Sequence, residues 1–273
     1  MEPVLIAELI AIGVGSGILG ALFGIGGGIV FVPVLTILFG LLAGEAVAVS
    51  LVGIIASSAG AASHYVEKGA ANVRLGLLLE ISTAIGAMIG AAVAVYVENW
   101  ILLVIFAIVE IYSAASMILI PERASESTDA DDALTFSYID AKGGAAHRYR
   151  LSNLWQGTAL CAAAGAMSSM TGVGGGTVKV PLMNLLMHVP IRAASNTSNY
   201  MIGITAASGA VIYIAHGTLL PDYAAAIAVG ALIGSYAGIR ISNKLDASSI
   251  RRYFSLLLLV VAGVVLLEAG GYL

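Results

Sequence analysis

Long apolar segments alternate with short polar connections along almost the whole chain. Each segment is close to the roughly 20 residues that an α-helix needs to cross the hydrocarbon core of a bilayer. Eight such segments cover residues 4–22, 44–66, 73–97, 99–120, 153–171, 193–215, 222–239 and 252–269. The pattern predicts an all-α polytopic membrane protein.

The composition of the 273 residues agrees with this interpretation. Hydrophobic residues make up 59% of the chain and charged residues only 10%, whereas soluble domains carry about 25% charged residues. The sequence has no phosphate-binding loop, no recognisable pair of nucleophile and base, and no metal-ligand spacing. We therefore expect no enzyme activity, no cofactor, no metal and no nucleic acid partner.

Basic residues concentrate in four of the connections between the segments. Because cytoplasmic loops carry the excess of Lys and Arg in membrane proteins, these connections are expected on the cytoplasmic side. The connections near Glu45, Glu98 and Asp222 contain no Lys or Arg. We therefore expect residues 121–150 in the cytoplasm and both termini outside it, in a multi-pass protein of the cell membrane. Eleven of the 12 basic residues fit this assignment, namely Lys68, Arg74, Arg123, Lys142, Arg148, Arg150, Arg192, Arg240, Lys244, Arg251 and Arg252.

The chain contains an internal repeat. A shift of 148 residues aligns residues 24–90 with residues 172–238 without a gap. The charge distribution gives each half an odd number of net crossings, so we expect two inverted repeats, a common construction of secondary transporters. Each repeat should hold one glycine-broken helix pair and three long spans. Identical pairs include Gly24/Gly172, Pro33/Pro181, Ser50/Ser198, Tyr65/Tyr213, Gly69/Gly217, Gly86/Gly234 and Gly90/Gly238.

The predicted units follow from the repeat and from one polar interruption. The first transmembrane repeat covers residues 1–120, the linker covers 121–150, and the second repeat covers 151–273. The linker is charged and rich in Ser, Asp and Gly. We interpret it as a partly disordered cytoplasmic tether, with a regulatory role as the alternative.

A glycine-rich motif opens both aligned regions, as GIGGGIVFVP at 24–33 and GVGGGTVKVP at 172–181. Each glycine costs a helix about 1 kcal/mol relative to alanine, so four within five positions predict a helix break. We expect short helices over 29–40 and 177–188 whose free N–H groups can bind an anion. Close helix packing is the alternative. The motif leaves open whether each broken pair spans the membrane or returns as a re-entrant hairpin. The other repeated glycines, Gly69, Gly86, Gly90, Gly217, Gly234 and Gly238, are interpreted as packing sites.

Polar residues inside the apolar segments are candidates for a binding site. Residues 196–199 form about one full polar helix turn, so at least one of them must face inward. The first half has only Ser50 at the matching place, followed by Ser57 and Ser58. Uncharged donors of this kind can bind an oxyanion and still release it, although hydrogen bonding between helices is an equal alternative.

Three ionisable residues also lie within apolar segments. Lys179 lies three residues after the last glycine of the second motif, at the position where the first half has Phe31. A lysine inside a membrane is costly and indicates a function, here neutralising an anion or carrying a proton, unless it reaches an interface. Glu80 and Glu110 lie in mid-segment and are candidates for a proton or charge relay.

The two motifs, together with NTSNYMIGITAASGAVIYIAHGTL from residue 196 and AVGALIGSYAGIRISNKL from residue 228, resemble the TauE/SafE family of sulfite exporters. The resemblance covers nearly the whole chain except the linker. It implies a polytopic secondary transporter of small sulfur-containing anions, such as sulfite, sulfoacetate or related sulfonates. A passive channel or facilitator for other small anions is the alternative.

The expected partners are therefore a small anionic substrate and the lipid bilayer, and a homo-oligomer is left open. The expected substrate-binding residues combine the glycine motifs with the polar residues near them. They are Gly24, Gly26, Gly27, Gly28, Ser50, Gly172, Gly174, Gly175, Gly176, Lys179, Asn196, Thr197, Ser198 and Asn199.

Overall fold

Helices form the apolar body of the structure, and their bounds follow the predicted segments closely. The computed structural model describes residues 2–119, 134–139, 146–242, 244, 245 and 247–270. Within these residues, seven helices are long and apolar enough to cross a membrane. The helix α6 is also long, but it is less apolar and is not among these seven. The fold class of an all-α polytopic membrane protein is confirmed. The long helices are α1 (Pro3–Phe23), α3 (Ala43–Glu67), α4 (Val73–Ala94), α5 (Asn99–Leu119), α6 (Leu154–Thr171), α8 (Ile191–Ala215), α9 (Pro221–Ser242) and α10 (Ala247–Ala269).

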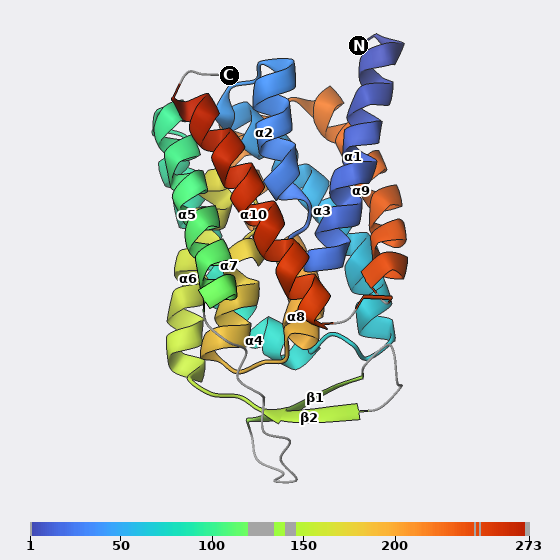
Figure 1. Cartoon of the computed structure of the whole chain (residues 1–273). Coiled ribbons are helices and arrows are strands. Elements are labelled where there is room, and N and C mark those ends of the chain that lie inside the picture. Colours follow the sequence, from blue (N-terminus) through green and yellow to red (C-terminus); the bar gives the residue numbers. More distant parts are fainter. Residues whose placement is uncertain (1, 120–133, 140–145, 243, 246, 271–273) are drawn as a thin grey trace.

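Each half of the chain opens with a helical hairpin that stops inside the bundle. α1 is followed by the short helix α2 (Gly28–Phe39). α6 is followed by α7 (Gly176–Pro181) and by a π-helical turn, η1 (Leu182–Leu186). Figure 1 shows α2 returning to the end of the bundle where α1 begins, while α6 enters from the opposite end. Both broken pairs are therefore re-entrant hairpins in this structure, and three long helices follow each of them.

Hydrogen bonds close the base of the second hairpin. The N–H of Ser152 donates to the carbonyl of Met187 (3.2 Å), and Asn153 Nδ2 donates to the carbonyl of Leu186 (2.9 Å). The chain therefore leaves η1 next to the residues where it entered α6. The second hairpin therefore enters and leaves at the same end of the bundle, so it adds no net crossing of the membrane.

Left-handed glycines produce the two turns. We call residues 24–28 the first glycine turn and residues 172–176 the second. Three glycines in each turn have φ between 71° and 89°, a conformation that glycine adopts without the steric cost of a Cβ atom. The predicted helix breaks are thus confirmed, and both short helices begin one residue before the predicted position. The left-handed glycines are Gly24, Gly26, Gly27, Gly172, Gly174 and Gly175.

The second short helix is shorter than predicted. The sequence predicts a helix over 177–188, but α7 ends at Pro181 and η1 follows it. Proline has no N–H to continue the α-helical ladder, but Pro33 at the matching position lies inside α2, so the proline alone does not explain the change to the wider π-helical geometry.

Glycines on α4 and α9 let each half pack closely on the other. Gly86 of α4 lies on the backbone of Ala162 in α6, and Gly234 of α9 lies on the backbone of Val14 in α1. Gly90 and Gly238 make the corresponding contacts one turn further along, on Ala166 and Ile18. A Cβ at any of these positions would clash, so the prediction of packing sites is confirmed for these four glycines.

The same prediction is wrong for Gly217, and at Gly69 the close neighbour is the Ile139 side chain rather than another helix. These two residues follow the ends of α3 and α8 with φ of 65° and 71°, and a Cβ on Gly217 would meet open space. Their role is to end the helix in a left-handed conformation, which glycine favours.

Part of the predicted linker forms a β-hairpin. β1 (Thr135–Ile139) pairs antiparallel with β2 (Ala146–Arg150), with Phe136 opposite Tyr149. Tyr149 is fully buried and its hydroxyl accepts a hydrogen bond from Asn72 Nδ2 (3.1 Å). The N–H of Ile139 donates to the carbonyl of Gly69 (3.0 Å). These ten residues of the predicted linker are therefore ordered, and their aromatic side chains pack against the α3–α4 connection. The rest of the predicted linker up to residue 145 lies mostly outside the described residues.

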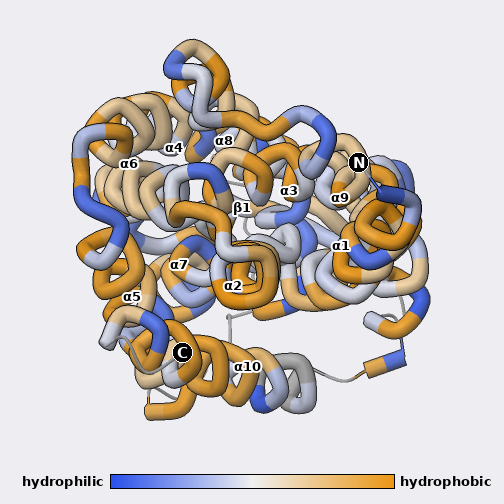
Figure 2. The backbone as a smooth tube through the Cα atoms, turned by 90° about the horizontal axis from the view of Figure 1, so that it is seen from above, coloured by the Kyte–Doolittle hydropathy of each residue, from blue (hydrophilic) through white to orange (hydrophobic). Residues whose placement is uncertain are grey.

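The outer surface of the bundle is apolar. Ile81, Ile108 and Leu259 expose 70%, 59% and 41% of their surface, although each lies well inside a long helix. Figure 2, a view along the bundle, shows α2 surrounded by longer helices with many hydrophobic positions. Large apolar side chains exposed in this way mark a lipid-facing surface.

The close helix contacts give a first prediction. Gly234→Ala should lower stability by about 1–3 kcal/mol, because its Cβ would push α9 away from α1. Thermal unfolding of the purified protein in detergent measures this effect.

Gly15→Ala is the matched control, since Gly15 lies on α1 with open space around it. That substitution should change stability by no more than about 1 kcal/mol, in the stabilising direction. Equal destabilisation by both substitutions would contradict the packing argument.

Candidate functional site

The two glycine turns contact each other inside the bundle. The Cα atom of Gly28 lies against the backbone of Gly172, and that of Gly176 lies against the backbone of Gly24. All residues of both turns are buried. The hairpins come from opposite ends of the bundle (Figure 1), so the first turns of α2 and α7 begin at one shared place.

Two serines related by the repeat bind the turns to each other. Ser50 Oγ in α3 donates to the carbonyl of Gly172 (2.5 Å), and Ser198 Oγ in α8 donates to the carbonyl of Gly24 (2.7 Å). Each hydroxyl therefore satisfies a carbonyl that the broken helix of the other half leaves without a helical partner. Both serines were predicted from sequence as site residues, and the structure places both at the turns.

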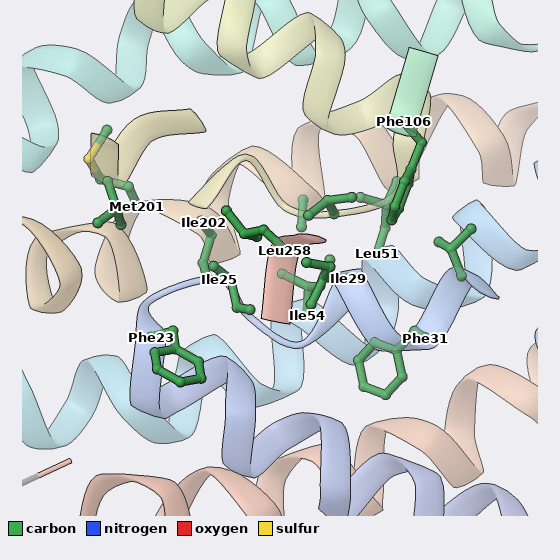
Figure 3. Close-up of a cluster of buried hydrophobic side chains, with 14 of the residues drawn as sticks. Phe23, Ile25, Ile29, Phe31, Leu51, Ile54, Phe106, Met201, Ile202 and Leu258 are labelled. Atoms are coloured by element: carbon green, nitrogen blue, oxygen red, sulfur yellow. The ribbon is translucent and has the colours of Figure 1, made fainter. Parts of the chain in front are cut away.

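Isoleucine side chains cover the turns in this conformation. A Cβ on Gly26 would meet Ile54 and Ile202, and a Cβ on Gly174 would meet Ile54 again. Ile54 and Ile202 differ by the repeat distance of 148 residues. Figure 3 shows both side chains beside Ile25 and Ile29 of the first hairpin. The turns are thus closed by apolar packing here.

Sequence reasoning missed Ile54 and Ile202. Isoleucines in an apolar segment carry no chemical signal of their own. Their relation by the 148-residue shift was available in the sequence, and it is the one signal that could have marked them.

The other polar residues of the 196–199 turn lie further from the glycine turns. Thr197 Oγ1 accepts a hydrogen bond from the N–H of Asn72 (3.0 Å), and Asn196 Nδ2 lies 3.4 Å from the carbonyl of Ala70. Both therefore contact the α3–α4 connection in this conformation. Asn199 Nδ2 donates to the carbonyl of Ala21 in α1 (3.1 Å), next to the first glycine turn.

Lys179 makes an ion pair that the sequence did not reveal. Its Nζ lies 3.4 Å from Glu80 Oε2 and donates to Thr205 Oγ1 (2.5 Å). The Thr205 hydroxyl in turn donates to Glu80 Oε1 (2.5 Å). Lys179 and Thr205 are fully buried and Glu80 is 3% exposed. The predicted anion-neutralising residue and one predicted relay residue thus belong to one cluster.

Glu110 lies beside the start of α7. It is fully buried and faces the Thr177 hydroxyl. Neither carboxyl oxygen makes a hydrogen bond of normal geometry to the described residues. Isolated buried carboxylates are costly unless neutralised, so this environment suits a carboxyl group that carries a proton.

A cavity of about 520 Å³ lies between α5, α6 and the α7–η1 segment. Its walls are mostly apolar and include Ile108, Leu160 and Leu182, with the Ser113 and Ser116 positions as polar exceptions. No residue of either glycine turn lines it. This cavity is therefore separate from the place where the turns meet.

Comparison with known proteins assigns the chain to a family. The model of the sulfite exporter TauE/SafE family matches residues 9–265. The chain belongs to the TauE/SafE family. A TauE/SafE protein is a membrane transporter rather than an enzyme, and the seven long apolar helices agree with a multi-pass membrane protein.

Two relatives in Bacillus subtilis (strain 168) carry transporter names. The chain is 29% identical over 261 residues to the probable membrane transporter protein YunE, covering 93% of this chain and 94% of the relative. It is 26% identical over 229 residues to the probable membrane transporter protein YdhB, covering 83% and 86%. No solved structure matches the chain.

The reciprocal serine contacts give a second prediction. Ser50→Ala and Ser198→Ala should each lower stability by about 1–3 kcal/mol, because each leaves a buried carbonyl unsatisfied. Thermal unfolding in detergent is again the measurement. Ser208→Ala should stay within about 0.5 kcal/mol, since among the described residues its hydroxyl bonds only to the Ile204 carbonyl of its own helix, at a partly exposed position. A neutral result at both buried serines would contradict their role in holding the turns.

Proposed function

We propose that this TauE/SafE protein is a secondary transporter of small sulfur-containing anions, such as sulfite, sulfoacetate or related sulfonates. The observation that carries the proposal is the meeting of two re-entrant glycine turns from opposite ends of the bundle. The sulfur chemistry of the substrate comes from the description of the family.

The anion would bind at the first turns of α2 and α7. The first N–H groups of a helix have no intrahelical partner, and the helix dipole makes them favourable for negative charge. Gly28 and Gly176 begin these helices, so an anion can approach the backbone without steric hindrance from a Cβ. Ser50 and Ser198 would supply uncharged hydroxyl donors from the adjacent helices.

Binding requires that the apolar cover opens. Ile54 and Ile202 occupy the space beside the turns, and we expect them to withdraw when the two hairpins move apart. Movement of one hairpin at a time would expose the turns to one side of the membrane and then to the other, as in alternating access. A passive channel would instead need a continuous conducting path past the turns in its open state.

A flux measurement tests this function. The purified protein in liposomes should take up labelled sulfite with saturation, and unlabelled sulfoacetate should compete. Gly174→Ala should reduce sulfite uptake by about tenfold or more, because a Cβ at φ 83° against Ile54 displaces the first turn of α7 and its hydrogen bonds to the anion.

Gly217→Ala is the matched control. Gly217 also has a positive φ but lies in open space away from the turns, so its substitution should preserve uptake. Non-saturating uptake with single-channel currents would replace the carrier with the channel. Absence of any anion flux in liposomes that contain the well-folded protein would contradict the proposed transport function.

We further propose that the end of the bundle with the β-hairpin faces the cytoplasm. Lys68, Arg74 and Arg148 lie at this end, next to the contacts between the hairpin and the α3–α4 connection. Arg192 lies there too and donates to the carbonyl of Leu245 in the α9–α10 connection. The positive-inside rule supports this orientation. The start of α1 and the end of α10 both lie at the other end of the bundle (Figure 1).

Thiol labelling of intact cells tests the orientation. A membrane-impermeant reagent should label Asn99→Cys, which lies at the end of the bundle where α1 begins. It should label Arg148→Cys only after permeabilisation. Both positions are exposed. The unsubstituted protein supplies the background, since Cys161 is buried. The reverse labelling pattern would invert the proposed orientation.

A further inference from the structure

A buried ion pair lies beside α7, and the matching positions beside α2 carry no charge. Lys179 of α7 contacts Glu80 of α4 and Thr205 of α8. The 148-residue shift places Phe31 at the position of Lys179, Ala228 at that of Glu80 and Ser57 at that of Thr205. The ion pair in one half therefore corresponds to a phenylalanine and an alanine in the other.

The first half shows that the ion pair is not needed for the architecture. Phe31 is fully buried, and its ring lies against Gly53 of α3 and Gly27 of the first glycine turn. Apolar packing thus fills this position in the same arrangement of helices. Replacement of buried ion pairs by apolar groups is often neutral or stabilising. A charged cluster retained beside α7 is consequently better explained by function than by stability.

The ion pair also lies in the right place to respond to an anion. Lys179 is in the first turn and a half of α7, and a Cβ on Gly175 would lie 3.3 Å from its Cε. Its stem therefore passes beside the second glycine turn. Glu80 belongs to α4 and Lys179 to the second hairpin, so the pair joins this hairpin to a long helix past which it must move during transport.

We propose that Glu80 is a proton-binding site that couples proton movement to anion movement. When Glu80 is ionised and the transporter is empty, Lys179 pairs with Glu80. When a proton binds to a carboxyl oxygen of Glu80, the ion pair is lost and Lys179 pairs with the transported anion. One proton then accompanies each cycle of anion binding, in the direction that the combined gradients favour. This inference rests on the proposed function and adds the coupling ion to it.

Charge balance supports the exchange of partners. Lys179 and Glu80 together are neutral, and an anion added to them would leave a buried negative charge, which is costly. A proton on Glu80 restores neutrality when the bound anion carries a single negative charge, as hydrogen sulfite does. The Thr205 hydroxyl accepts from Lys179 and donates to Glu80, and its rotation allows it to accept from a protonated Glu80 instead.

Other titratable groups face the cluster from the neighbouring helices. Cys161 of α6 lies within electrostatic range of both Glu80 and Lys179. Glu110 of α5 lies on the side of α7 that Thr177 faces. α8 contributes the Thr205 hydroxyl. Of the carboxyl and thiol groups named here, only Glu80 contacts Lys179 directly, so a substitution at Glu80 isolates the proposed switch.

Glu80→Gln tests the proposal in liposomes that contain the purified full-length protein and a pH-sensitive dye. Glutamine mimics a permanently protonated carboxyl. Exchange of labelled sulfite against unlabelled sulfite at equal pH should persist. Accumulation of labelled sulfite driven by a pH gradient should fall by about tenfold or more relative to the unsubstituted protein, together with sulfite-dependent proton movement. Sulfite itself binds protons near neutral pH, but that contribution is the same in both proteins, so their difference reports on Glu80.

Two further variants separate coupling from structure. Glu98→Gln removes an exposed carboxylate at the end of the bundle where α1 begins. This variant should accumulate sulfite like the unsubstituted protein. The double variant Glu80→Ala with Lys179→Phe copies the apolar pair of the first half. It should keep its thermal unfolding temperature and lose sulfite exchange, because the counter-charge for the anion is gone.

Each remaining outcome decides between the hypotheses. If Glu80→Gln or the double variant accumulates sulfite under a pH gradient as well as the unsubstituted protein does, Glu80 is not the proton site. Sulfite exchange by the unsubstituted protein would still support the proposed function in that case. Absence of sulfite exchange in the folded, unsubstituted protein would overturn the proposed function and the coupling with it.

Discussion

A polypeptide backbone that breaks its helical ladder inside a bilayer must find partners for the exposed N–H and C=O groups within the protein. The arrangement of this transporter follows from that constraint at two places. The carbonyls of Gly24 and Gly172 each receive a serine hydroxyl from a helix beside the other turn. Because these donors belong to α3 and α8, each hairpin keeps its bond only while its turn is packed against the long helix that supplies the hydroxyl. The same contact must weaken for the turns to receive a ligand.

Local features of the sequence predicted most of the fold. Apolar length gave the long helices to within a few residues, and glycine content gave both breaks, since each depends only on neighbouring residues. The β-hairpin was not predicted, because Phe136 and Tyr149 gain their stability from Asn72 and the α3–α4 connection, which are distant in sequence. The candidate site was predicted in part: Ser50 and Ser198 reach the turns, whereas Asn196 and Thr197 bind elsewhere in this conformation.

The ion pair shows what a single sequence leaves out. Lys179 and Glu80 were both recognisable as costly residues in apolar segments, but 99 positions separate them, and no periodicity links α4 to α7. The repeat provides the comparison that local patterns lack. Positions that match across the 148-residue shift have the same role in both halves, as Ile54 and Ile202 or Gly86 and Gly234 do. Positions that differ, such as Lys179 and Phe31, indicate where the two halves have taken different roles.

The packing of α1 on α9 has a consequence for biosynthesis. Gly13 and Gly17 of α1 lie against the backbone of α9 around residues 227–231, and the chain makes α9 only after more than 200 further residues. During translation the small-residue face of α1 therefore meets lipid or the insertion machinery before its permanent partner exists. Truncated chains that end before α9 would keep that face uncovered, which makes them natural targets for membrane quality-control proteases.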